Sequence, residues 1–231
     1  LRKYFLSVVI EYPEEFLENW SKIRNHSSQD KERNFTVYQL IKIHNKIFEG
    51  KNTNIIEFGT DRGGTLTTIS NFTKPNTNIY AVDSFGYYAD EIKKNVSKFD
   101  SHYLGKYKPF TKKTRFKDFD HKKMTNDLNE ILIKKNSKLE TIVGYFPNLD
   151  ENKFKKISNI KYSFVHLDFD LYKPTIDCFT FIKDRLEKNA IILVDDYNFI
   201  NQEGVKKAVS DLKIDLSKGI QTQSGQLILY S

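Results

Sequence analysis

Two apolar, β-prone runs of this chain end abruptly in carboxylates, and this feature restricts the fold most. The first run ends in Asp168 and Asp170, with one residue between them. The second run, 190–194, is followed directly by Asp195 and Asp196. Ligands of open parallel sheets bind in the crevice at the carboxyl ends of the strands. Two strands that deliver acids to one crevice therefore predict a site for a hard cation, for acid/base chemistry, or for both.

The rest of the chain alternates short apolar strands with amphipathic helices. Further strands are predicted at 54–58, 79–83, 141–143, 214–216 and 226–230, and helices at 11–26, 31–48, 66–72, 90–99, 120–135, 174–187 and 202–212. Strands that alternate with helices indicate an α/β fold, with a mostly parallel, seven-stranded sheet and helices on both faces.

The same pattern predicts one structural domain with a helical N-terminal extension, residues 1–50, before the α/β part, residues 51–231. The stretch 86–135 is too long for a plain strand-to-helix connection. We expect it to form an inserted lid over the site. The aromatic residues of this lid would either line an acceptor pocket or pack the lid itself; they are Tyr87, Tyr88, Tyr103, Tyr107 and Phe110.

Composition limits the choice of partners. The chain has 231 residues, of which 39% are hydrophobic, and it lacks an apolar run of the roughly 20 residues that a membrane span needs. The net charge of +7 permits an anionic partner, but the lysines are spread along the chain, so we expect no nucleic acid. A single cysteine, Cys178, excludes an internal disulfide and favours a reducing, cytoplasmic location. A homo-oligomer is compatible with this composition.

A glycine-rich turn follows the strand predicted at 54–58. Glu57 precedes Gly59, and Gly63 and Gly64 lead into the next helix. Glycines here let a ligand approach the backbone and the amides of a helix N-terminus. The spacing differs from the dinucleotide and P-loop motifs, and an acid at Glu57 repels phosphate. This turn favours a ligand that bears an ammonium group, such as S-adenosylmethionine, although glycines that serve packing alone would give the same pattern.

Asp83 ends the next strand and is well placed to bind two ribose hydroxyls, as in nucleotide-binding βαβ units. A helix-capping or turn aspartate is the simpler alternative.

The strand-end acids form the third pattern. Asp168, Asp195 and Asp196 offer oxygen ligands, which suit Mg²⁺, Mn²⁺ or Ca²⁺. Asp170 is two residues from Asp168, so on an ideal strand both point to the same side, and Asp170 could take a proton from a substrate. His166 alternates onto the same side, and we interpret it as a core histidine whose hydrogen bonds are satisfied. Strand-end and capping roles would explain the acids without a ligand.

The order and spacing of these motifs resemble class I S-adenosylmethionine-dependent methyltransferases, and more closely the macrocin O-methyltransferase (TylF-like) family. The resemblance covers roughly residues 32–212. It rests on Glu32-Arg33, Ile56-Glu57-Phe58-Gly59, Val82-Asp83-Ser84-Phe85-Gly86, Gly144-Tyr145-Phe146-Pro147, His166-Leu167-Asp168-Phe169-Asp170-Leu171-Tyr172 and Val194-Asp195-Asp196-Tyr197.

The resemblance implies a Rossmann-like, S-adenosylmethionine- and Mg²⁺-dependent O-methyltransferase that acts on a hydroxyl of a sugar or glycoside. The basic residues of the predicted lid would suit a phosphate-bearing carrier of that sugar. It implies Asp168, Asp195 and Asp196 as metal ligands and Asp170 as general base. The expected cofactor-binding residues are Glu57, Gly59, Thr60, Gly63, Gly64, Thr65, Asp83, Ser84, Gly144, Tyr145, Phe146 and Asp168.

The chain departs from the family pattern between the two acids, where Phe169 replaces the usual glycine. If strand alternation holds, Phe169 points away from the metal. Lys173-Pro174 replaces the usual Glu-Ser, and Asn189-Ala190 replaces a double glycine. These changes leave two further interpretations open: an O-methyltransferase for a non-sugar hydroxylated metabolite, and a non-catalytic binding module that keeps the nucleotide fold.

Overall fold

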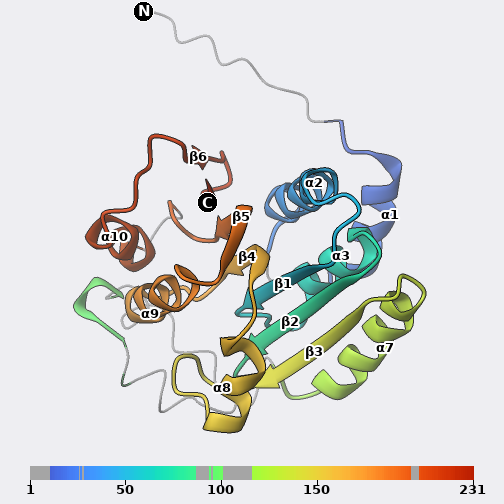
Figure 1. Ribbon diagram of the computed structural model, residues 1–231, viewed down its shortest axis with the longest axis horizontal. Helices are drawn as coiled ribbons and strands as arrows, with labels where there is room; N and C mark the ends of the chain where they lie inside the picture. The colour runs from blue at the N-terminus through green and yellow to red at the C-terminus, as the bar shows by residue number, and fades with distance from the viewer. Residues whose placement is uncertain are drawn as a thin grey trace, which may run out of the picture.

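The computed structural model describes residues 11–25, 27, 29–86, 94, 96–100, 116–198 and 203–231. A seven-stranded sheet in the order β3-β2-β1-β4-β5-β7-β6 lies at its centre (Figure 1). The strands are β1 (Thr53–Phe58), β2 (Thr77–Asp83), β3 (Lys138–Val143), β4 (Tyr162–Leu167), β5 (Leu186–Val194), β6 (Ile220–Gln221) and β7 (Leu227–Tyr230). The first five are parallel to one another, and β7 is antiparallel to β5 and β6. The predicted, mostly parallel sheet is confirmed.

Helices cover both faces of this sheet, as the alternating pattern predicts (Figure 1). They are α1 (Glu14–Ile23), α2 (Lys31–Ile47), α3 (Gly64–Phe72), α7 (His121–Ile133), α8 (Glu151–Ser158), α9 (Tyr172–Ile182) and α10 (Glu203–Asp211), with a 3₁₀ turn η1 (Lys98–Asp100). None of these helices is long and apolar enough to span a membrane.

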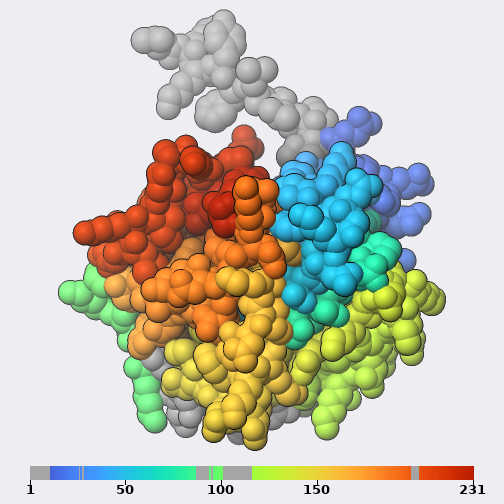
Figure 2. Space-filling model, in the orientation of Figure 1, coloured from blue at the N-terminus to red at the C-terminus, as the bar shows by residue number. Residues whose placement is uncertain are grey.

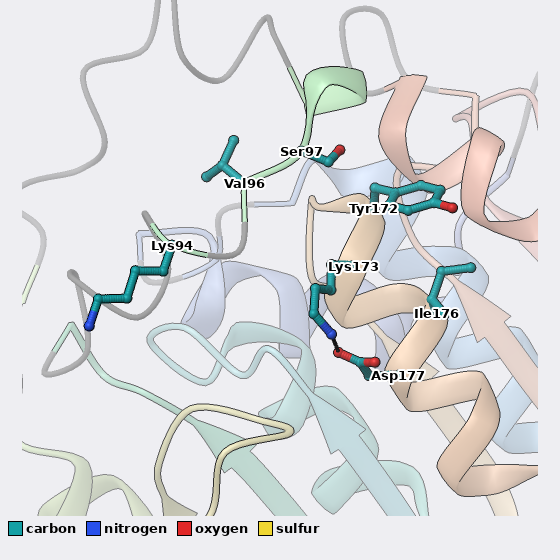
Figure 3. Close-up of a pocket in the computed structure, with 7 residues that line it drawn as sticks. All are labelled: Lys94, Val96, Ser97, Tyr172, Lys173, Ile176 and Asp177. Carbon is teal, nitrogen blue, oxygen red and sulfur yellow. Dashed lines mark hydrogen bonds and ion pairs between the residues drawn. The ribbon is translucent and has the colours of Figure 1, made fainter.

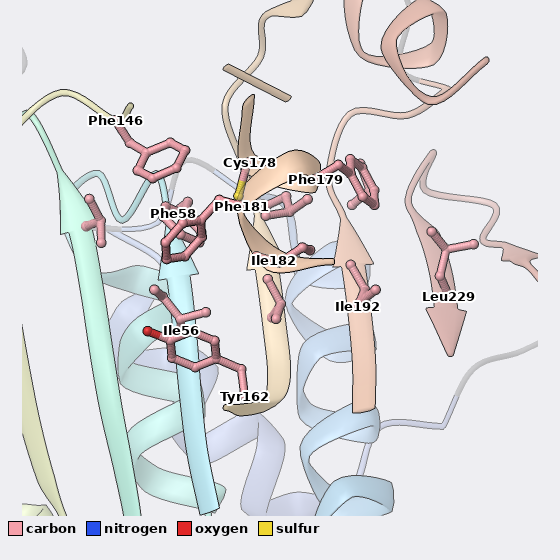
Figure 4. Packing of buried hydrophobic residues seen from close by; sticks show 14 of the residues in the cluster. Ile56, Phe58, Phe146, Tyr162, Cys178, Phe179, Phe181, Ile182, Ile192 and Leu229 are labelled. Carbon is pink, nitrogen blue, oxygen red and sulfur yellow. The ribbon is translucent and has the colours of Figure 1, made fainter. Parts of the chain in front are cut away.

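Each face of the sheet has its own hydrophobic core. On one face, strand residues such as Phe58 and Ile192 pack against α8, α9 and α10, with Phe181 at the centre (Figure 4). On the other face, residues such as Ile55 and Phe164 pack against α2, α3 and α7. Burial of each such side chain stabilises the fold by about 1.5–3 kcal/mol. Because both faces are covered, the carboxyl edge of the sheet is left as the place for a ligand.

The N-terminal helices pack directly onto the α/β part of the chain. The side chain of Asn19 in α1 donates to Thr68 in α3, and Thr68 donates to Asn34 in α2, at 2.8 and 2.7 Å. His44 of α2 lies 2.8 Å from the Ser163 hydroxyl in β4, and burial lowers the pKa of His44 to about 4. Figure 2 shows α2, in light blue, beside the orange and red C-terminal part of the chain. The helical extension therefore reaches the central strands.

The described structure differs from the expected elements in two places. The predicted strand 214–216 is wrong, because the Asp215 side chain accepts a hydrogen bond from the Ser217 amide and bends the chain there. The predicted helix 174–187 ends at Ile182, and β5 begins at Leu186. Much of the predicted lid, including its tyrosines and Phe110, and half of the helix predicted at 90–99 lie outside the described residues.

Truncation of a core aromatic residue in α1 tests how firmly the N-terminal helices are attached. Phe16 is fully buried against Phe35 and Tyr38, whereas its neighbour Leu17 is 42% exposed. We expect Phe16→Ala to lower the free energy of unfolding by about 3–5 kcal/mol. Leu17→Ala, the matched control, should change it by about 0.5 kcal/mol or less. Urea unfolding measures both, and equal losses would contradict the packing described here.

Candidate active site

The strand ladder continues past the ends of β1, β4 and β5 and sets two of the predicted acids side by side. The Asp168 amide donates to the Phe58 carbonyl at 2.9 Å, and the Asp195 amide donates to the Leu167 carbonyl at 2.8 Å. Asp168 therefore extends β4 along β1, and Asp195 extends β5 along β4. Both side chains stand at the carboxyl edge, where the sequence predicts a ligand.

Sharp turns bring the other two acids back to the same place. Asp170 and Asp196 have φ angles of 61° and 56°, in the left-handed region that aspartate tolerates better than most residues. Carboxylate oxygens of Asp168, Asp170 and Asp196 lie within 4.8 Å of one another, and so do ligand atoms of His166, Asp168 and Asp195. The four predicted acids do converge. Strand alternation, the reason expected for the position of Asp170, is wrong, because β4 ends at Leu167. The turn after the strand directs the Asp170 side chain toward the other acids.

Phe169, the residue between the two acids, points into the core. Its ring lies 5.6 Å from the ring of Phe58 and 6.1 Å from that of Phe146, on the face that α8, α9 and α10 cover. The expectation that Phe169 points away from the acids is confirmed, so its bulk leaves the acid cluster open.

Three polar side chains that the sequence analysis missed hold the acids from two sides. Arg33 of α2 pairs with Asp195 at 2.6 Å and also with Asp196. The Gln29 amide donates to Asp195 at 2.8 Å and to Asp168 at 3.3 Å. The Gln226 amide donates to the other carboxylate oxygen of Asp195, also at 2.8 Å. The residues before and within α2 thus form one wall of the site.

Burial dominates the electrostatics of this cluster. It raises the pKa of Asp168, Asp195 and Asp196 above the ordinary carboxylate value, and the neighbouring acids raise it further. The Arg33 guanidinium opposes this effect in all three. Burial in turn lowers the pKa of Arg33, but the charges of Asp195 and Asp196 outweigh it and raise that pKa. The cluster therefore attracts positive charge, as protons or as a cation.

The glycine turn lies directly beside the acids. Gly59 has φ 83°, and a Cβ added there would lie 1.8 Å from the Asp168 carbonyl oxygen, so only glycine permits this approach of β1 to β4. Gly63, also with positive φ, caps α3, whose first residues are Gly64 and Thr65. The hydroxyl of Thr60 is buried without a hydrogen-bond partner among the described residues. These features leave backbone amides and one polar atom for a ligand.

Glu57 and His166 face each other across β1 and β4. His166 Nδ1 lies 2.9 Å from Glu57 Oε1, and both side chains are fully buried. His166 is thus in the core, as expected. Its hydrogen bonds are not all satisfied, however: Nε2 of His166 and Oε2 of Glu57 have no partner among the described residues.

The remaining predicted cofactor residues surround the ends of β2 and β3. The Asp83 carboxylate accepts hydrogen bonds from the backbone amides of Asp61 and Phe85, and burial raises its pKa to about 6. Asp83 therefore braces the glycine turn, and Ser84 follows it. The Tyr145 hydroxyl is buried without a partner among the described residues. The Phe146 ring belongs to the core, so at Gly144–Phe146 a ligand would meet mainly backbone and Tyr145.

A separate cavity of about 340 Å³ opens beside the N-terminus of α9 (Figure 3). Tyr172, Lys173 and Asp177 line it from α9, and Lys94 and Ser97 line it from the other side. Lys173 pairs with Asp177 at 2.7 Å. Because Tyr172 follows Asp170 by two residues, this cavity lies next to the acid cluster along the chain.

One signal in the sequence indicates Arg33. Its helix buries Val37, Leu40, Ile41 and His44, which recur at helical spacing, and Arg33 extends the same face by one turn. An arginine on a buried face needs a negative partner. Gln29 and Gln226 carry no comparable signal, because uncharged amides occur in many loops.

Comparisons with known proteins support the fold. No protein-family model matches the chain, and no curated protein sequence matches it. Among solved structures, the O-methyltransferase NovP superposes with a TM-score of 0.61 at 16% identity, over 89% of this chain and 81% of NovP. The calicheamicin methyltransferase CalS11 gives 0.58 at 17% identity, over 96% and 94%. An O-methyltransferase from Bacillus cereus, in complex with SAH, gives 0.53 at 11% identity, over 97% and 94%.

These likenesses and the strand order define the class of fold. The chain has the Rossmann-like fold of class I methyltransferases. At these identities the comparisons establish the fold alone, and membership of the TylF-like family stays a prediction.

Substitution of Gly59 tests the close approach of the glycine turn to Asp168. Gly50 has a similar φ of 71°, but a Cβ added there meets nothing within 4 Å, so it serves as the matched control. We expect Gly50→Ala to lower the free energy of unfolding by about 1–2 kcal/mol through the backbone conformation alone. Gly59→Ala should lower it clearly more, because β1 and β4 must also move apart. Urea unfolding compares the two, and equal losses would refute the close contact.

Proposed function

We propose that the protein is an S-adenosylmethionine-dependent O-methyltransferase that acts on a hydroxyl of a sugar or glycoside. A divalent cation, Mg²⁺ or Mn²⁺, would be held by Asp168, Asp195 and Asp196. One observation carries the proposal: in a methyltransferase fold, four carboxylates converge at the carboxyl edge, directly against the glycine turn that Gly59 makes.

The glycine turn fits the methyl donor. Backbone amides at the start of α3 and the buried Thr60 hydroxyl are available to a ligand. Oε2 of Glu57, which has no hydrogen-bond partner among the described residues, suits the ammonium group of the methionine part. Asp83, ionised at neutral pH because its pKa is about 6, has further lone pairs for ribose hydroxyls. These contacts would hold the sulfonium close to the acids.

The acid cluster fits a divalent cation. Four carboxylates converge here and Arg33 pairs with two of them, so among the described residues of the cluster negative charge exceeds positive charge when every acid is ionised. Oxygen ligands of this kind suit Mg²⁺ and Mn²⁺. When bound, the cation would orient the acceptor hydroxyl and acidify it. Asp168, Asp195 and Asp196 would provide its oxygen ligands.

Asp170 is the proposed general base. Its carboxylate lies beside Asp168 and Asp196 but belongs to the turn before α9, and it is partly exposed. From there Asp170 accepts the proton of the acceptor hydroxyl, while the oxygen–carbon bond forms and the sulfur–carbon bond breaks. The products are the methyl ether, a neutral thioether and a protonated Asp170. The protein contributes positioning and this proton acceptor.

Two considerations support a sugar acceptor. A structural neighbour, CalS11, is named as a TDP-rhamnose 3′-O-methyltransferase. The cavity beside α9 carries Lys94 and Lys173, of which Lys173 pairs with Asp177, and the remaining positive charge suits a phosphate-bearing carrier. A non-sugar hydroxylated metabolite is the second candidate, and profiling of acceptors with labelled methyl donor separates the two.

Ligand-dependent melting tests the cofactor and the cation together. We expect S-adenosylhomocysteine at about 100 times its Kd to raise the Tm by about 5–10 °C, because it binds the folded chain alone. Mg²⁺ should raise the Tm further. In Asp195→Asn the shift with S-adenosylhomocysteine should persist and the Mg²⁺ increment should shrink.

Each other outcome has a definite meaning. A chain that S-adenosylhomocysteine does not stabilise is not a methyltransferase of this class. A shift that Mg²⁺ never changes would mean that Arg33 alone supplies the positive charge, and the cation would then be excluded from the proposal.

Removal of the proposed base tests the role of Asp170. Asp170→Asn should lower kcat by about 10²–10⁴-fold at saturating Mg²⁺, because the amide cannot accept the proton. The Tm shift with S-adenosylhomocysteine should stay as in the original chain. Asp184→Asn, at an exposed position just after α9, is the control and should keep full turnover. Undiminished turnover in Asp170→Asn would remove Asp170 from the mechanism.

A further inference from the structure

The buried pair of Glu57 and His166 lies next to the acid cluster, and His166 has no role in the steps above. The two residues are direct neighbours across the parallel strands β1 and β4. Their side chains are 0% exposed, and His166 Nδ1 lies 2.9 Å from Glu57 Oε1. The sheet therefore fixes both the position of this imidazole and its orientation.

The second nitrogen of this imidazole has no hydrogen-bond partner among the described residues. Nε2 of His166 is buried and accepts or donates no hydrogen bond within the described part of the chain. Buried polar atoms almost always have a partner, so an atom of this kind indicates a group that the chain itself does not supply.

The surroundings of Nε2 indicate the charge of that group. Ligand atoms of His166, Asp168 and Asp195 lie within 4.8 Å of one another. When Nδ1–H donates to the Glu57 carboxylate, Nε2 carries a lone pair. The imidazole that bears this lone pair has a ring nitrogen within 4.8 Å of carboxylate oxygens of Asp168 and Asp195. A lone pair and carboxylates that share one enclosed space repel each other unless a proton or a cation lies between them.

A carboxylate that accepts a hydrogen bond from one imidazole nitrogen, while the other nitrogen binds a metal, is a common arrangement in metalloproteins. The carboxylate fixes the tautomer and the ring orientation. Glu57 and His166 have this relation, with Asp168 and Asp195 at the distance of further ligands.

We propose that His166 binds the divalent cation through Nε2, next to Asp168 and Asp195, and that Glu57 is the positioning residue that holds His166 for this purpose. The proposal rests on the cation site of the proposed function and changes its chemistry. One nitrogen ligand among oxygens favours Mn²⁺ and similar transition ions over Mg²⁺, whose ligands are mostly oxygens. The site would then bind Mn²⁺ in preference to Mg²⁺.

Pulsed electron paramagnetic resonance of the Mn²⁺-loaded full chain tests the proposal directly, since it detects a nitrogen bound to Mn²⁺ without any turnover. We expect a ¹⁴N coupling in the original chain, and its replacement by a ¹⁵N coupling when the histidines are labelled. His166→Gln should abolish the coupling and weaken Mn²⁺ binding by about 10–100-fold, with less effect on Mg²⁺. His121→Gln, at a partly exposed position at the start of α7, is the matched control and should keep the coupling.

The role of Glu57 has its own readout. Glu57→Gln keeps an oxygen that can accept from Nδ1–H but loses the negative charge, so the ¹⁴N coupling should persist with weaker Mn²⁺ binding, by about tenfold. Unchanged Mn²⁺ affinity in this variant would remove Glu57 from the proposal.

The outcomes separate this inference from the proposed function. Mn²⁺ that binds to the original chain without a nitrogen coupling would refute the role of His166 and leave an all-oxygen cation site in place. A chain that binds neither Mn²⁺ nor Mg²⁺ would overturn the inference and the cation part of the proposed function together. The labelled original chain gives its answer even if His166→Gln does not fold.

Discussion

The contact between Arg33 and the strand-end acids is the interaction on which the site depends. Asp195 and Asp196 are 2% exposed, and Asp168 and Asp170 lie within ligand distance of the same cluster. Buried charges of one sign are strongly unfavourable unless a partner of the other sign meets them. Arg33 provides that partner inside the chain. The N-terminal helix α2 is therefore electrostatically part of the site.

A second constraint ties the glycine turn to the acids. The β1–β4 ladder runs on to Asp168, and this is possible because Gly59 has no side chain to hold the Asp168 carbonyl away. The turn that would receive the methyl donor and the strand end that bears the acids thus share one backbone contact. The proposed distance between sulfonium and acceptor oxygen is set by the sheet, whose geometry varies little, and less by loops.

The sequence predicts those parts of the molecule that follow from local pattern. The spacing of apolar residues predicts the sheet and most helices. The acids that follow two of the strands predict that the four acids meet and that Phe169 points away from them. The partners of the acids could not be predicted in this way, because Gln29 and Arg33 reach Asp195 and Asp196 across 166 and 163 positions of the chain. The orientation of the His166 ring, whose Nε2 has no partner among the described residues, depends likewise on a residue in another strand. That residue is Glu57, 109 positions earlier.

The net charge of the site stays the same during the proposed reaction, and this distinguishes the acids from one another. The sulfonium brings one positive charge into a site that is already negative, and methyl transfer removes that charge. Asp170 gains a proton in the same reaction, so the net charge of the site does not change. A guanidinium at Arg33 keeps its charge throughout, because it cannot be deprotonated in proteins. Three of the four acids therefore differ in their tasks: Asp195 and Asp196 pair with a fixed positive charge, while Asp170 alone has to change its charge.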